Sequence, residues 1–196
     1  MRSTLFSSAL LLAGLAGTAA GQSMHGQHTA AAKGSPNDAT LILNALSAGP
    51  ASVTSGATVM NHDGRVLRKG TNDWVCMPDM PDRPNNTPMC LDAPWRVVID
   101  AWVNKKIPTV SQVGFAYMLQ GDIPVSNTDP YATGPTATND WIQHGDPHIM
   151  VLIPDQKLLD GMSTDPTAGG PFVMWKGTPY AHIMLPGTPP PKPKKK

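Results

Sequence analysis

The chain contains no glutamate, and all 14 of its acidic residues are aspartates. Charged residues make up only 15% of the sequence, against about a quarter in an average soluble protein. Because glutamate favours helices and both proline and glycine interrupt them, 21 prolines and 18 glycines argue against a helical bundle or coiled coil. Five tryptophans and many aliphatic residues can still form a core, which argues against a wholly disordered chain.

The first residues have the pattern of a Sec-type signal peptide. Arg2 is followed by an apolar run over residues 5–16 and then by small residues up to Gly21. This run is too short to span a bilayer as a stable anchor. We therefore expect residues 1–21 to be removed, leaving no transmembrane anchor, and the mature protein to be periplasmic or extracellular.

The chain has only two cysteines, Cys76 and Cys90. In an oxidising compartment such a pair most often forms a disulfide. The alternative, a redox-active pair, lacks the close Cys-x-x-Cys spacing. Residues 77–89 between the cysteines contain four prolines and show neither helical nor strand periodicity, so we expect a disulfide that closes this loop.

Charge argues against nucleic acid as a partner. The 10 basic and 14 acidic residues of positions 22–188 give this part a net charge of −4, whereas a nucleic-acid-binding domain needs a basic face. Residues 22–34 are small and polar and predict a flexible leader. Residues 188–196 predict a disordered Pro/Lys tail whose four lysines make at most a weak contact with an anionic surface.

Two helices are predicted within residues 35–187. The first has Ser35 as its N-cap and ends before Gly49. The second is capped by Asp92, and its apolar positions recur at helical spacing and include Trp95 and Trp102. A further short helix is expected at residues 156–159.

Several strands are predicted between and after these helices. The dipeptide Asp63-Gly64 is a strong hairpin signal, and further apolar runs occupy residues 113–119, 149–153, 172–175 and 181–185. Residues 121–140 are predicted to form a long polar loop. This order favours a single α+β domain over residues 35–187, with an antiparallel sheet, two or three helices and one disulfide.

Histidine and methionine recur two residues apart on strand-like segments. The three pairs are Met60 with His62, His148 with Met150, and His182 with Met184. Residues at i and i+2 of a strand share a face, so each pair places an imidazole beside a thioether. Because these ligands together favour copper, particularly Cu(I), the pattern predicts a copper site.

Packing offers an alternative interpretation of the same residues. Methionine often fills a core, and alternate methionines on a strand are typical of a buried face. In this interpretation the four methionines that pack under the tryptophan-bearing helix have no ligand role, and the histidines are hydrogen-bonded core residues. These methionines are Met118, Met150, Met174 and Met184.

A second hypothesis is a small exported hydrolase. The segment 121–148, with the strands that carry His148 and His182, is expected to form a cleft. No Gly-x-Ser-x-Gly or Ser-x-x-Lys motif identifies a nucleophile. For catalysis the segment offers Ser126 and the carboxylates of Asp129, Asp140 and Asp146 near His144 and His148. The possible ligand-binding residues of the segment are Ser126, Asp129, Tyr131, Trp141 and His144.

A third hypothesis is a structural envelope module or one that binds glycans or peptides. It rests on aromatic residues in or beside loops, namely Tyr131, Trp141, Trp175 and Tyr180. Taken together, the sequence favours an exported, non-enzymatic envelope protein that binds copper or a small ligand through its His/Met strands.

Overall fold

The computed structural model describes residues 37–143 and 145–187. The predicted signal peptide, leader and tail lie outside this part of the chain, as do Ser35 and His144. No helix within the described ranges is long and apolar enough to cross a membrane.

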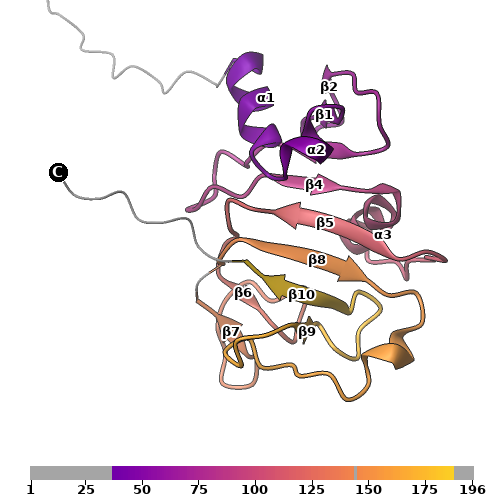
Figure 1. The fold of residues 1–196 in the computed structure, drawn as a ribbon. Coiled ribbons are helices and arrows are strands. Elements are labelled where there is room, and N and C mark those ends of the chain that lie inside the picture. The colour runs from indigo at the N-terminus through magenta and orange to yellow at the C-terminus, as the bar shows by residue number, and fades with distance from the viewer. Residues whose placement is uncertain (1–36, 144, 188–196) are drawn as a thin grey trace, which may run out of the picture. The chain divides into compact units, whose positions relative to one another are not determined.

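Eight strands form one sheet in the order β2-β1-β3-β4-β5-β8-β10-β9 (Figure 1). Their bounds are β1 Thr58–Met60, β2 Val66–Arg68, β3 Val75–Met77, β4 Met89–Leu91, β5 Gly114–Met118, β8 His148–Leu152, β9 Phe172–Met174 and β10 His182–Pro186. Every neighbouring pair is antiparallel except β1 and β3, which are parallel. The predicted α+β fold is therefore confirmed, with a sheet that is mostly but not wholly antiparallel.

A second, small sheet includes part of the segment predicted as one long polar loop, residues 121–140. Strand β6 (Val125–Ser126) lies within that segment and pairs antiparallel with β7 (Trp141–Ile142), which begins directly after it. Each strand is only two residues long, too short for an alternating pattern to be recognised in the sequence. Residues Val125 and Ile142 pack against the main core, so this segment covers part of the large sheet.

The described residues contain three α-helices and one short 3-10 helix. The bounds are α1 Asp38–Leu46, α2 Ala51–Thr54, α3 Ala93–Val103 and η1 Gln156–Leu159. The Oδ1 atom of Asn37 accepts a hydrogen bond from the Thr40 amide at 2.9 Å, so Asn37 is the N-cap of α1 and the predicted cap, Ser35, was wrong. The predicted cap of α3 is confirmed, because Asp92 accepts from the Trp95 amide at 3.0 Å.

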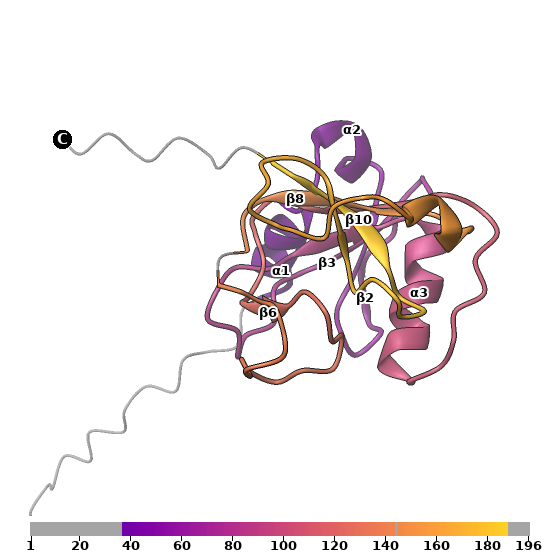
Figure 2. The same cartoon turned by 90° about the horizontal axis from the view of Figure 1, so that it is seen from below.

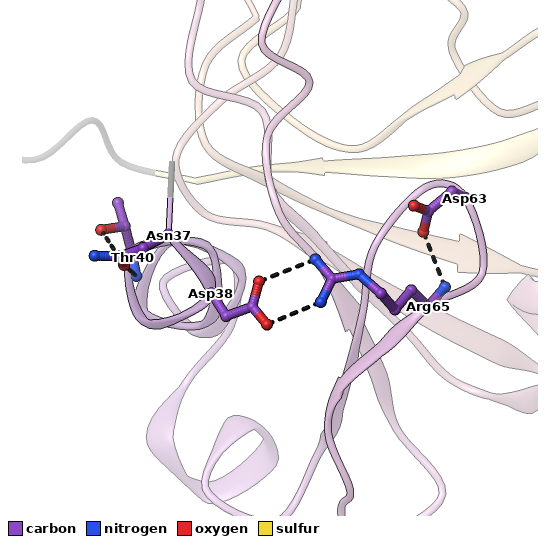
Figure 3. Close-up of polar contacts among 5 residues, drawn as sticks. All are labelled: Asn37, Asp38, Thr40, Asp63 and Arg65. Carbon is purple, nitrogen blue, oxygen red and sulfur yellow. Dashed lines mark hydrogen bonds and ion pairs between the residues drawn. The ribbon is translucent and has the colours of Figure 1, made fainter. Parts of the chain in front are cut away.

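An ion pair connects the start of α1 to the β1–β2 hairpin (Figure 3). The guanidinium of Arg65 donates two hydrogen bonds, of 2.8 and 2.9 Å, to the carboxylate of Asp38. The Arg65 amide also donates to Asp63 in the predicted Asp-Gly turn. Hydrogen bonding to Arg65 lowers the pKa of Asp38. Both side chains are exposed, so the solvent screens this pair and its contribution to stability is small.

Helices α1 and α3 pack on opposite faces of the sheet. Adjacent residues of a strand point to opposite faces. In β4, Cys90 packs in a cluster with Ala45 of α1, whereas Leu91 packs in a cluster with Trp95 of α3. We call the side that carries α3 the α3 face; Figure 2 shows α3 and β6 on the same side of β8 and β10.

The predicted disulfide between Cys76 and Cys90 is present. The two cysteines are directly opposite each other on the antiparallel strands β3 and β4, with their Cα atoms 4.0 Å apart. The proline-rich residues 78–88 connect these strands. The disulfide therefore closes a hairpin whose own sequence has little tendency to form one.

We expect the Cys76→Ala/Cys90→Ala double variant to lose about 3 kcal/mol of unfolding free energy, because the disulfide restricts the unfolded chain. Urea denaturation followed by tryptophan fluorescence measures the loss. Wild-type protein unfolded in the presence of a reductant is the control and should show a similar loss. A loss below about 1 kcal/mol in both samples would contradict the prediction.

Candidate functional site

The structure brings two of the three His/Met pairs together. His148 and Met150 lie on β8, and His182 and Met184 lie on β10, the neighbouring antiparallel strand. Met60 lies on β1 and His62 just after it, and strands β3, β4 and β5 separate β1 from β8. At the usual strand spacing this is about 19 Å.

His62 already has a structural role. Its Nε2 atom lies 2.7 Å from the carbonyl oxygen of Pro78, and a carbonyl only accepts, so Nε2 carries the proton and donates. This ring holds the start of the proline-rich loop near the β1–β2 hairpin. The Met60 and His62 pair is therefore separate from the pairs on β8 and β10.

The register shows how the two central pairs lie. Met150 and Met184 are directly opposite each other, and His148 is opposite Pro186. His182 is four residues from Pro186 along β10, so the Cα positions of the two histidines are separated by about 13 Å along the strands. The imidazoles therefore lie on either side of the Met150–Met184 pair.

Two further methionines, which the sequence did not identify as ligands, lie opposite the histidines. Met118 of β5 is the partner of His148, and Met174 of β9 is the partner of His182. The Cβ atoms of opposite residues are typically about 4.5–5.5 Å apart. We call these six residues of the α3 face the His/Met face; all are buried, and they are Met118, His148, Met150, Met174, His182 and Met184.

Both histidines of this face have the same hydrogen bonding. The Nδ1 atom of His148 lies 2.7 Å from the Asp146 carbonyl oxygen, and Nδ1 of His182 lies 2.9 Å from that of Tyr180. Since the carbonyls accept, each Nδ1 carries the proton, and in a neutral imidazole this leaves Nε2 as a bare acceptor. His148 is 4% exposed and His182 1%, and neither Nε2 has a hydrogen-bond partner among the described residues. Leaving such an acceptor unsatisfied costs about 1–3 kcal/mol.

His182 is enclosed by aromatic rings. The ring centroids of Trp95 and Trp175 lie 5.0 and 5.2 Å from that of His182, and both rings stand edge to face with it. This burial lowers the pKa of His182 to about 4, although the hydrogen bond to Tyr180 opposes the shift. His182 is therefore a neutral imidazole at physiological pH, the form that binds a metal ion.

The charged neighbour of His148 is Asp122, which follows β5. Burial raises the pKa of Asp122, while the positive charge of Arg83 acts in the opposite direction. Within residues 37–143 and 145–187, no three His, Cys, Asp or Glu side chains converge in a way that could hold a metal ion. The other donor side chains on the His/Met face are the thioethers of its four methionines.

The other predicted site residues have mostly local roles. Ser126 is fully buried, and its Oγ accepts hydrogen bonds from the Thr128 and Asp129 amides at 3.2 and 2.9 Å. Asp129 accepts in turn from the Tyr131 amide. These contacts are typical of turns. Trp141 is half-buried on β7.

Two pockets of the described residues lie beside other parts of the fold than the two histidines. One, of about 270 Å³, lies beside η1 and is bordered by Lys157 and Lys176. The other, of about 70 Å³, lies between Val98 of α3 and Pro179. Trp95 and Trp175 pack around His182, and neither of these two pockets is lined by His148 or His182. The cleft expected between segment 121–148 and the two histidines stays a prediction.

A search of protein-family models, curated proteins and solved structures finds no match to this chain. The function must therefore be inferred from the residues themselves. The feature that core packing leaves unexplained is the pair of bare, buried Nε2 atoms. In native proteins such groups are uncommon, and a bound ion or water often explains them.

The lowered pKa of His182 predicts acid sensitivity. The unfolded chain protonates this histidine near pH 6.5, but the native protein does so only near pH 4. Between these values the unfolded state binds more protons, so the free energy of unfolding falls by up to about 3 kcal/mol as the pH is lowered from 6.5 to 4.

Urea denaturation at several pH values tests this expectation, with His182→Leu as the comparison. The variant has no imidazole to protonate at this position, so its stability should fall less than that of the wild type over the same range. Parallel pH profiles for the two proteins would show that His182 does not cause the acid sensitivity.

Proposed function

We propose that this protein is an exported, non-enzymatic protein that binds Cu(I) at the His/Met face. The observation that carries the proposal is that two buried imidazoles present bare Nε2 atoms on a sheet face lined by four methionines. Neutral imidazole and thioether are ligands that together favour Cu(I).

The local structure of each histidine supports a ligand role. Histidines that bind metals usually donate a hydrogen bond from the other ring nitrogen to a carbonyl or carboxylate, which fixes the tautomer and the ring orientation. Both His148 and His182 have this arrangement, with backbone carbonyls as acceptors. Packing alone accounts for the methionines, but it does not account for these two unsatisfied nitrogens.

The available donors favour Cu(I) over harder cations. Structural zinc sites usually take four His, Cys or carboxylate ligands, and calcium and magnesium take oxygen ligands. The His/Met face contains no oxygen-bearing side chain and only two imidazoles. Apart from the Asp122 carboxyl near His148, its surroundings, which include Trp95, Leu152 and Phe172, are apolar, so a soft monovalent ion fits this environment better than a hydrated divalent ion.

The register favours one ion at each histidine. The two imidazoles are too far apart along the strands to share an ion. His148 has Met118 opposite it and Met150 two residues along its own strand. His182 has Met174 and Met184 in the equivalent places. Each imidazole therefore has thioethers nearby without any ligand from the other half of the face.

Export is the second part of the proposal. It is supported by the N-terminal sequence pattern and is compatible with the Cys76–Cys90 disulfide, since disulfides persist mainly in oxidising compartments. The hydrolase hypothesis gains no comparable support, because the Ser126 hydroxyl is buried and bonded to backbone amides.

An anaerobic Cu(I) titration against a chromogenic chelator tests the proposal. The wild type should bind one ion per histidine, and His148→Leu and His182→Leu should each lose one of them. Leucine keeps the position apolar and buried, and circular dichroism checks the fold. His62→Ala is the matched control: its ring is bonded to Pro78, so this variant should keep the full stoichiometry. Absence of Cu(I) binding, or binding unaffected by both leucine variants, would refute the proposal.

Cu(I) should also stabilise the fold, because it binds the native arrangement. At a free Cu(I) concentration about 100 times the dissociation constant, each ion should raise the free energy of unfolding by about 2.7 kcal/mol. Denaturation with and without Cu(I) measures this effect. The His148→Leu/His182→Leu double variant should show no such gain, and an equal gain in that variant would place the copper elsewhere.

A further inference from the structure

A row of aromatic rings leads from His182 to the surface. The ring centroids of Trp175 and His182 are 5.2 Å apart, those of Trp102 and Trp175 are 6.1 Å apart, and those of Tyr131 and Trp102 are 6.3 Å apart. We call Trp175, Trp102 and Tyr131 the aromatic chain. Each spacing lies within the range of direct aromatic contact.

Exposure increases along the aromatic chain. His182 is 1% exposed, Trp175 and Trp102 are half-buried, and Tyr131 is 41% exposed. The phenol oxygen of Tyr131 lies 2.8 Å from that of Tyr180, which donates to the Lys106 carbonyl. The chain thus connects the dry interior of the His/Met face with solvent through residues of α3 and two loops.

Each tryptophan of the chain is held in place. The indole nitrogen of Trp102 donates to the Pro130 carbonyl at 3.1 Å, and that of Trp175 donates to the Ser126 carbonyl at 2.8 Å. Trp175 also has a φ of 55°, which is rare for a bulky residue and costs of order 1–3 kcal/mol. Its amide donates to the Asn127 carbonyl at 2.7 Å, and this contact helps to hold the strained conformation.

We propose that the aromatic chain carries electrons from the surface to the His182 end of the His/Met face, and so removes oxidising equivalents from the buried site. Tryptophan and tyrosine are the aromatic side chains that lose one electron most readily, and rings in contact exchange electrons fastest. The role of the chain in protecting a metal site rests on the proposed Cu(I) binding. The electron transfer itself depends only on the rings.

The reaction balances with hydrogen peroxide as the oxidant. If Cu(I) were bound, peroxide would take one electron from it, which would leave Cu(II), hydroxide and a hydroxyl radical. The radical takes an electron from Trp175 and becomes a second hydroxide. Trp102 returns an electron to Trp175, and Tyr131 returns one to Trp102. Tyr131 releases its phenolic proton to water, where it neutralises one hydroxide, and a thiol then restores the tyrosyl radical with a hydrogen atom.

Electron transfer along the aromatic chain should affect the oxidation of nearby methionines. Oxidants convert thioethers to sulfoxides, which are polar and disrupt a packed core. Met174 lies opposite His182 and Met184 is two residues along the same strand, so both are near the end of the chain. Electrons supplied through Trp175 should therefore spare these two methionines.

The first test uses metal-free protein, so it does not depend on copper. Azide radicals generated by pulse radiolysis oxidise tryptophan, and the absorption bands of tryptophan and tyrosine radicals follow the electron. A Tyr117→Phe background removes the separate pair of Tyr117 with Trp74. In that background we expect tryptophan radicals to convert to tyrosine radicals at a rate independent of protein concentration. Adding Tyr131→Phe should remove most of this conversion, and an unchanged yield would overturn the proposal.

The second test uses Cu(I)-loaded protein treated with hydrogen peroxide. Mass spectrometry measures sulfoxide at Met174 and Met184, and we expect a several-fold increase in Trp102→Phe over the wild type. Met80, which is exposed, reports general oxidation and should be modified equally in both proteins. Equal sulfoxide at Met174 and Met184 in the two proteins would refute the protective role.

The two proposals fail in different ways. Radical transfer to Tyr131 in protein that binds no Cu(I) would support the chain and refute the proposed function. Cu(I) binding that requires His148 and His182, without radical transfer to Tyr131, would support the function and refute the chain.

Discussion

The antiparallel register of β8 and β10 is the constraint on which the candidate site depends. It places Met150 opposite Met184, and it places His148 and His182 on the same face at either side of that pair. A shift of one residue would move the side chains of one strand to the opposite face. The alternation within each His-Ile-Met tripeptide and the pairing between the strands therefore act together, and neither alone assembles the His/Met face.

Local sequence signals predicted much of the fold. The Asp63-Gly64 turn and the Asp92 cap act within a few residues, so the β1–β2 hairpin and α3 could be recognised directly. The predicted cap of α1, Ser35, was wrong: serine and asparagine are both common N-caps, and only the structure shows that the Asn37 side chain accepts a hydrogen bond from the Thr40 amide. Strands β6 and β7 are too short to give a periodic signal.

The sequence predicted only some residues of the candidate site, and the reason is physical. Spacing within a strand shows which residues share a face, but strand order depends on contacts between distant parts of the chain. Met118 and Met174 became candidate ligands only when β5 and β9 were seen beside β8 and β10. The same strand order separates Met60 and His62 from the site. The bare Nε2 atom of His182 likewise depends on burial by Trp95 and Trp175, which no local pattern encodes.

The hydrogen bonds of the two histidines have a consequence for how this site can arise. Each imidazole donates to the carbonyl of the residue two positions earlier in the chain, Asp146 for His148 and Tyr180 for His182. The tautomer and the direction of each ring are thus set within a three-residue stretch of backbone. Such a unit is self-contained, so repeating it on a second strand duplicates an oriented imidazole without redesigning the surrounding protein. Strands β8 and β10 each carry one copy of it.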